Sequence, residues 1–135
     1  MDKLNVFSSK DLVKITQHRS GEIKFGEKII TVPIDENWIE FITNCEAKFV
    51  LIGLPEDIGV KANLGRTGTA TAFESTLKSL VNFQHNKFCK GSELIALGEI
   101  DFSQEMEISK TLDTTNKEDR KKLFSLVENI DKDVS

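Results

Sequence analysis

The residues best suited to chemistry gather in a glycine-containing loop over residues 53–69. Its glycines, among them Gly65 and Gly68, permit positive φ or a close approach to a ligand. Asn63 and Arg66 supply hydrogen-bond donors, and the guanidinium of Arg66 can hold a carboxylate with two bonds. With Asp57, these residues form the candidate substrate-binding set of the loop. The pattern fits a ligand-binding loop and equally fits an ordinary structural one.

The end of this loop also has a feature of anion sites. Thr67 or Thr69 lies at a predicted helix start, where free amides and the helix dipole favour an anion. The loop is nevertheless not a P-loop, because the Gly-Lys-Ser/Thr ending is absent. No G-x-G-x-x-G follows the preceding apolar segment either, so a dinucleotide fingerprint is excluded.

A weaker candidate is the carboxylate pair Glu99 and Asp101, which we place just beyond a short apolar strand over residues 93–98. Alternation in an extended segment would let both face one cleft. The alternative is a solvated strand end, with Lys61 and Arg66 neutralising the two carboxylates from the loop. The pair alone does not decide between these interpretations.

Histidine and cysteine offer little further chemistry. His85 and Cys89 lie four residues apart and could share a metal on a helix, but zinc needs four ligands and no second cluster supplies them. We therefore interpret both as helix-end and loop residues. His18 and His85 have no nearby Ser and Asp arrangement, so a catalytic triad is not predicted. Cys45 and Cys89 are expected to be free thiols.

Composition limits the class of protein. The 135 residues are 39% hydrophobic and 30% charged, which is typical of one globular domain. A net charge of −4 argues against a nucleic-acid partner, since phosphate binding needs a basic face. No apolar run approaches the roughly 20 residues that span a membrane, and the N-terminus lacks the apolar core of a signal peptide. We expect a cytoplasmic protein without membrane contact.

The elements around the loop alternate between strand and helix. Residues 48–53 form a continuous apolar run, which predicts a strand buried on both faces. After the loop, apolar residues at helical spacing predict a helix packed on the sheet: Ala70, Phe73, Leu77, Leu80 and Val81. Beyond the strand at 93–98, residues 102–114 are polar and irregular. A capping box from Thr115 to Glu118 then opens a last amphipathic helix, with Leu123, Val127, Ile130 and Val134 on one face. The two βα units predict parallel strands.

The first 45 residues are interpreted as an N-terminal extension folded onto this body. A short helix is predicted over residues 8–18, capped by Ser8 or Ser9. Alternating residues on either side of Gly26 predict a β-hairpin or an extended arm. Asp35 is the predicted N-cap of a helix over residues 36–46. Residues 46–135 are then the first two βα units of the α/β domain.

The loop resembles a known family signature. The residues Gly53-Leu54-Pro55-Glu56-Asp57-Ile58-Gly59-Val60, followed by Asn63, Gly65-Arg66 and Gly68, resemble the N-terminal segment of the arginase, agmatinase and formimidoylglutamase (ureohydrolase) superfamily, most closely its formimidoylglutamase-like branch. The segment 97–101, Leu-Gly-Glu-Ile-Asp, resembles the family's second-strand segment. Ala72-Phe73 and Leu77 stand where most members have Gly-Pro and an arginine, which suggests a divergent branch.

This resemblance implies the N-terminal part of a three-layer α/β/α fold with a parallel sheet. It also implies an enzyme in which two manganese ions activate a water that attacks the carbon of an amidine or guanidine substrate. The family's metal ligands lie in Gly-Gly-x-His, Asp-x-His-x-Asp and Asp-x-Asp segments, none of which is present in these 135 residues. The resemblance therefore implies an inactive N-terminal portion, in which residues 57–68 line the active-site mouth of the whole enzyme.

Two hypotheses of different classes follow. The first is this ureohydrolase-like portion, and the second is a non-catalytic α/β binding or interaction module that stands alone. A sheet of two strands with uncovered edges would in either case expose apolar surface, so self-association is expected.

Overall fold

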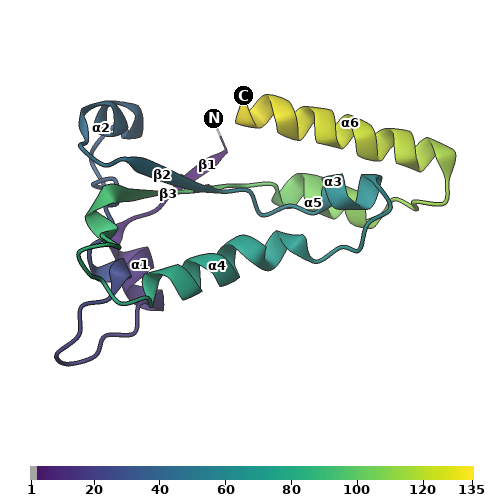
Figure 1. Ribbon diagram of the computed structural model, residues 1–135. Coiled ribbons are helices and arrows are strands. Elements are labelled where there is room, and N and C mark those ends of the chain that lie inside the picture. Colours follow the sequence, from purple (N-terminus) through teal and green to yellow (C-terminus); the bar gives the residue numbers. More distant parts are fainter. Residues whose placement is uncertain (1–2) are drawn as a thin grey trace. The chain divides into compact units, whose positions relative to one another are not determined.

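The computed structural model describes residues 3–135 and is a mixed α/β structure (Figure 1). Two compact units are distinguished, and each is described by itself. The sheet unit contains Asn5–Gly53 and Glu74–Glu99. The helical unit contains the N-terminal residues to Leu4, Leu54–Phe73 and Ile100–Ser135. The chain therefore passes between the units several times.

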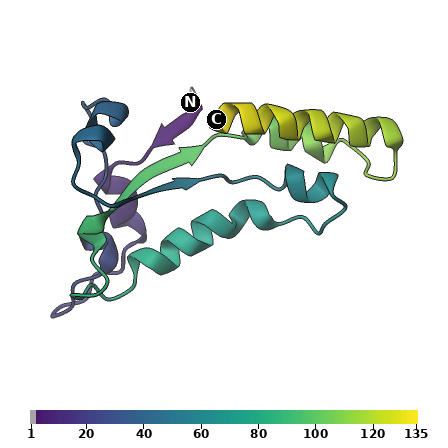
Figure 2. The same ribbon diagram turned by 45° about the horizontal axis from the view of Figure 1, so that its top comes forward.

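The sheet has three strands, β1 (Leu4–Val6), β2 (Phe49–Gly53) and β3 (Leu94–Ile100), in the order β1-β3-β2. The parallel pairing of β2 with β3 confirms the prediction from the two βα units. Strand β1 was not predicted. The N–H of Asp101 donates to the carbonyl of Lys3 and that of Phe7 to the carbonyl of Leu97, each at 2.9 Å. Partner numbers fall along β1, so it runs antiparallel to β3, as the arrows in Figure 2 show.

Burial differs sharply between the two parallel strands. Strand β3 is central, and Ile95, Leu97 and Ile100 are at most 1% exposed. Strand β2 lies at the edge, where Phe49 and Val50 remain 62% and 43% exposed. The prediction that β2 is buried on both faces was therefore wrong. An apolar run shows that a strand could be buried. Whether it is buried depends on which other elements pack against it, and these lie elsewhere in the chain.

Gly98 lies in the central strand β3, at the point where the backbone of the edge strand β1 comes closest to it. Its φ is +151°, and a Cβ built there would lie 2.0 Å from the carbonyl oxygen of Asn5. The register with β2 also shifts here, because Leu51 pairs with Ala96 but Ile52 with Gly98. Only glycine combines this backbone conformation with so close a neighbouring strand.

The N-terminal extension forms helices where they are predicted, with Ser8 as the predicted cap of the first helix and a changed cap on the second. Helix α1 spans Ser9–Ile15, and the side chain of Asp11 accepts hydrogen bonds from the amide and hydroxyl of Ser8. Helix α2 spans Trp38–Asn44. Its N-cap is Asn37, whose Oδ1 accepts from the amides of Ile39 and Glu40 at 2.9 and 3.3 Å. Asp35, the predicted cap, is two residues too early to reach those amides.

The segment between these helices is an arm rather than a hairpin. A 3₁₀ turn, η1 (Phe25–Glu27), occupies the place of the predicted hairpin turn. Beyond it, Ile30 forms a single parallel bridge with Ile95 of β3, and Lys24 an antiparallel bridge with Gln84. Alternation marked these residues as extended, but their partners are distant in the sequence, which a local pattern does not reveal.

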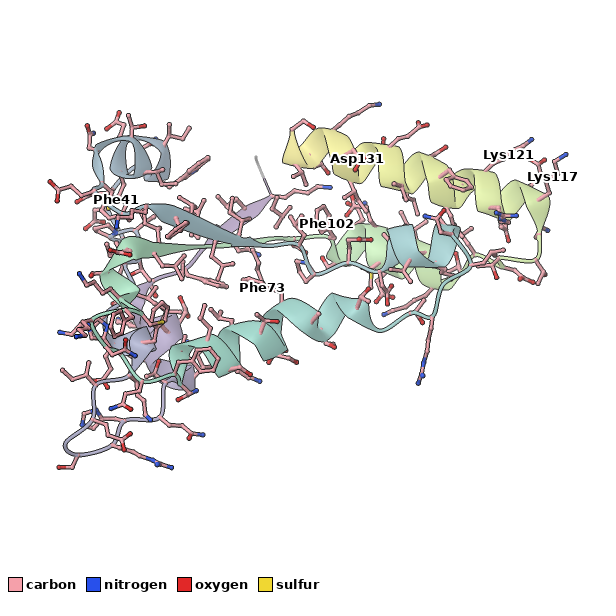
Figure 3. All side chains as sticks on the ribbon, in the orientation of Figure 1. Phe41, Phe73, Phe102, Lys117, Lys121 and Asp131 are labelled. Carbon is pink, nitrogen blue, oxygen red and sulfur yellow. The ribbon has the colours of Figure 1, made fainter. Side chains whose placement is uncertain are left out.

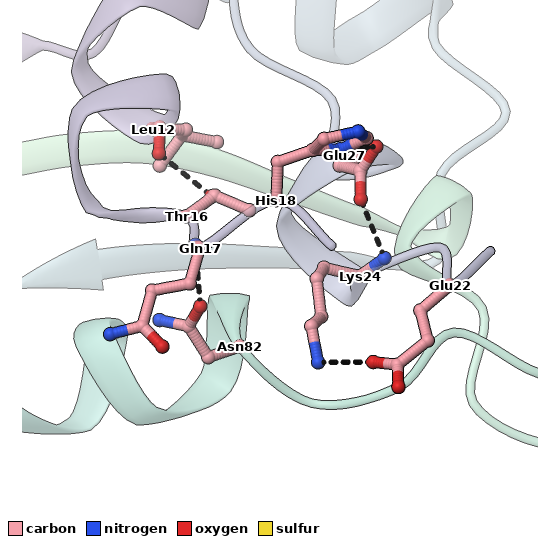
Figure 4. A network of polar contacts seen from close by, with 8 residues as sticks. All are labelled: Leu12, Thr16, Gln17, His18, Glu22, Lys24, Glu27 and Asn82. Carbon is pink, nitrogen blue, oxygen red and sulfur yellow. Dashed lines mark hydrogen bonds and ion pairs between the residues drawn. The ribbon is translucent and has the colours of Figure 1, made fainter. Parts of the chain in front are cut away.

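Polar contacts fasten this extension to the end of helix α4 (Ala72–Val81) (Figure 4). Asn82 accepts from the amide of Gln17 at 2.7 Å and donates to the carbonyl of Ile15 at 2.9 Å. On α4 itself, Leu77 and Val81 are buried, as predicted from the apolar spacing. The extension thus folds onto the body of the sheet unit, through side-chain to backbone bonds as well as apolar contacts.

The helical unit contains α3 (Ile58–Ala62), η2 (Thr69–Thr71), α5 (Ser103–Lys110) and α6 (Lys117–Val134). The 3₁₀ turn η3 (Gly91–Glu93) belongs instead to the sheet unit. Helix α5 occupies residues that were predicted to be irregular. The residues that α5 buries are the polar Glu105 and Ser109, so no apolar stripe marked it as a helix.

Helix α6 confirms the predicted last helix, with its cap shifted by one residue. Asn116 Oδ1 accepts from the amides of Glu118 and Asp119, whereas Thr115 bonds with Asp113. Leu123 and Ile130 of the predicted stripe are buried.

An ion-pair cluster joins the N-terminus to the helices of this unit. Lys3 Nζ lies 2.5 Å from Glu105 Oε1 on α5 and 2.9 Å from Asp133 Oδ2 on α6. Hydrogen bonds to these two carboxylates raise the pKa of Lys3 to about 12. Glu105 is 9% exposed, so Lys3 compensates a nearly buried carboxylate. Among residues 3–135, no helix is both long and apolar enough to cross a membrane.

Candidate functional site

A hydrogen bond between Asp57 and Gly68 closes the predicted substrate loop. Asp57 precedes α3 and is 9% exposed, and its Oδ2 accepts the amide of Gly68 at 2.7 Å. Gly68 has φ +121°, a conformation that favours glycine. This bond joins the two ends of the loop across eleven positions. The structure therefore gives Asp57 an architectural contact and not an open position toward a ligand.

The middle of the loop is shaped by the end of α3. Asn63 Nδ2 donates to the carbonyl of Gly59 at 3.0 Å, and Leu64 takes a positive φ of 60°. The amide of Gly65 donates to the carbonyl of Val60 at 2.8 Å. A Cβ at Gly65 would lie 2.7 Å from a methyl of Val60, so the tight return requires glycine. Asn63 and Gly65 thus end the helix and reverse the chain.

Arg66 is the member of the candidate set that remains available. It lies at the exposed tip of the loop, and within residues 3–135 its guanidinium has no hydrogen bond or ion pair. The neighbouring Thr69 hydroxyl is 3.4 Å from the carbonyl of Glu56, and the helix start predicted at Thr67 or Thr69 is the short 3₁₀ turn η2. The loop therefore presents one free, bidentate donor on a backbone held from both ends.

Glu99 and Asp101 occupy different settings. Strand β3 extends to Ile100, so Glu99 lies within the strand and not beyond it, and it is half-buried. Asp101 is exposed, and its Oδ1 accepts the amide of Ser103 at 2.8 Å. Hydrogen bonds from the side chain and amide of Ser103 lower the pKa of Asp101 below its ordinary value. Asp101 thus supports the start of α5, which accounts for it without a ligand.

The residues present do not form a metal centre. Among residues 3–135, no group of three or more His, Cys, Asp or Glu side chains is placed to hold a metal ion. His85 Nδ1 accepts the amide of Gly91 at 3.3 Å, and Cys89 lies in a turn bridged to Asn86.

A hollow that the sequence did not single out lies in the helical unit. It measures about 560 Å³ and combines the loop residue Leu64 with residues before and within the first turns of α6. Its lining residues are Leu64, Thr114, Thr115, Lys117, Arg120, Lys121 and Phe124. Figure 3 shows Lys117 and Lys121 projecting from the start of α6. Residues 117–122 contain four cations and two acids, a mixed pattern typical of an exposed helix start, and only the fold brings the cations together with Leu64.

Comparison with known proteins adds no assignment. No protein-family model matches the chain, and neither a curated protein nor a solved structure matches it.

Proposed function

We propose that this chain is the N-terminal portion of a manganese-dependent, cytoplasmic ureohydrolase-like enzyme. Such an enzyme hydrolyses a linear C–N bond of a guanidino or formimino compound, and the formimidoylglutamase-like branch is the closest model. The observation that carries the proposal is the ordered signature loop of residues 53–68, which directly follows a strand in parallel pairing. In α/β proteins, loops at the carboxyl ends of parallel strands commonly bind ligands.

Three features of the loop support this assignment. Two glycines of the signature are required by the backbone conformation. Gly65 lies where the chain reverses beside Val60, and Gly68 has a positive φ. Asp57 holds the loop closed through the amide of Gly68. Arg66 is left exposed at the tip, where it can bind the carboxylate of an amino-acid-like substrate. The role of the chain in this proposal is substrate positioning, with metal ligands from outside these residues.

The proposal is tested on the protein translated from its whole reading frame and loaded with manganese. We expect histidine- and aspartate-containing metal segments of the ureohydrolase type beyond residue 135. We also expect release of urea from arginine or agmatine, or of formamide from N-formimidoylglutamate. The 135-residue chain alone is expected to be inactive. A whole protein that hydrolyses none of these amidines would refute the proposal.

The variant Arg66→Ala tests the loop within that enzyme. Loss of a charge-assisted contact that substrate and transition state share would raise KM about tenfold and leave kcat nearly unchanged. Arg19→Ala is the matched control, because Arg19 is an exposed arginine of the sheet unit outside the signature. Equal KM values for the two variants would remove Arg66 from the substrate site.

A further inference from the structure

The hollow beside α6 is lined by cations and holds no carboxylate among its lining residues. Lys121 forms an ion pair with Glu118 at the helix surface, with 3.1 Å between Nζ and Oε1. Lys117 and Arg120 have no ion pair in the described part of the chain. The lining of the hollow thus carries three cations, two of them without an ion-pair partner in the described residues, while Glu118 and Asp119 lie in the same turn outside the lining.

The positive charge of Arg120 has no carboxylate partner in the described residues. Its Nε is buried and has no hydrogen-bond partner among residues 3–135. Because Nε has no exposed surface, a ligand in the hollow could reach the guanidinium only through its two other nitrogens. Lys117, by contrast, is exposed and adjusts freely to a ligand. An anion in the hollow would give the Arg120 guanidinium the counter-charge that the protein does not supply.

The other walls of the hollow are apolar or hydroxylic. Leu64 and Phe124 are 62% and 43% exposed, although both are large apolar side chains. Thr114 and Thr115 add hydroxyl groups at the entrance of α6. Leu64 has a φ of 60° at the end of α3, and its amide donates to the carbonyl of Lys61 at 3.0 Å. A purely ionic ligand such as phosphate would leave the apolar wall unused.

We propose that this hollow binds a small organic carboxylate, with its carboxylate on Arg120 and Lys117 and its short apolar chain against Leu64 and Phe124. The guanidinium matches a carboxylate through two parallel N–H···O bonds. The apolar chain gains by covering surface that is otherwise exposed to water. The site lies in the helical unit alone and stands independently of the ureohydrolase proposal, because it needs neither metal nor turnover.

The test is a titration of the 135-residue chain with butyrate, followed through the backbone amide signals of Leu64, Lys117 and Arg120 by two-dimensional NMR. We expect saturable shifts at these residues that weaken as salt is raised. Butylamine has the same apolar chain with the opposite charge, and inorganic phosphate has charge without the chain. Both are expected to bind at least several-fold more weakly than butyrate.

Charge-removing variants locate the carboxylate. Arg120→Gln should weaken butyrate binding about tenfold. Lys132→Gln removes an exposed cation from the last turn of the same helix and should leave binding within about twofold of the unaltered chain. Lys117→Gln provides the same test at an exposed position if Arg120→Gln does not fold. Absent saturation, equal loss in Lys132→Gln, or phosphate binding as tight as butyrate would overturn the proposal.

Discussion

Replacement of Gly98 by alanine probes the contact on which the strand order depends. A Cβ at this position would lie 2.0 Å from the carbonyl oxygen of Asn5 and 3.0 Å from the Cα of Val6. Both neighbours are backbone atoms of β1, so no side-chain rotation relieves the overlap. Either β1 moves away from β3, or β3 distorts at the point where its register with β2 already shifts.

The expected cost has two parts. Overpacking of a filled site costs about 1–3 kcal/mol. A non-glycine residue at φ +151° adds about 1–3 kcal/mol of backbone strain. The Gly98→Ala variant should therefore lose about 2–6 kcal/mol, a large share of the 5–15 kcal/mol that typically stabilises a small protein.

Urea unfolding measures this loss, as a lower midpoint with an unchanged slope. Gly21→Ala is the matched control, because Gly21 has φ +80° and no atom within 4 Å of a built Cβ. The Gly21→Ala variant has the backbone strain of a positive φ without the steric overlap. Its free energy of unfolding should fall by only about 1 kcal/mol. If Gly98→Ala is no more destabilising than Gly21→Ala, the close approach of the β1 backbone to Gly98 is refuted.

Two further changes probe the helical unit. Asp57→Ala removes the acceptor of the Gly68 amide and should cost about 1.5–3 kcal/mol, with faster hydrogen exchange at Gly68 than at other loop amides; unchanged exchange there would contradict the closed loop. Lys3→Met tests the ion-pair cluster through pH. Because the pKa of Lys3 is raised from its ordinary 10.5 to about 12, its contribution is complete below pH 10.5 and is lost as pH rises through 12. The stability difference between the original chain and Lys3→Met should therefore shrink over that range, and a difference independent of pH would contradict the pairing.

Features that depend only on a residue and its neighbours in the chain could be predicted from the amino-acid sequence. Apolar spacing predicted the buried Leu77 and Val81 of α4, and Leu123 and Ile130 of α6. The two apolar runs at 48–53 and 93–98 predicted strands that do pair in parallel. Glycines marked the loop of residues 53–69, and the structure assigns a backbone reason to Gly65 and Gly68. Hydrophobic periodicity and glycine conformation are local properties, so they can be inferred without the fold.

Which polar groups have partners depends on long-range contacts, and these are visible only in the folded chain. Helix α5 was missed because it buries Glu105, and that carboxylate is compensated by Lys3, 102 positions away in the chain. Asp57 belongs to the predicted site, yet its carboxylate accepts the amide of Gly68, whereas Arg66 has no hydrogen bond or ion pair within the described residues 3–135. Arg120 is not among the predicted site residues, although the fold places it with Leu64 in the lining of the cationic hollow. Burial and pairing depend on atoms that only long-range contacts bring together, and those contacts decide whether a charged side chain supports the fold or remains available to a ligand.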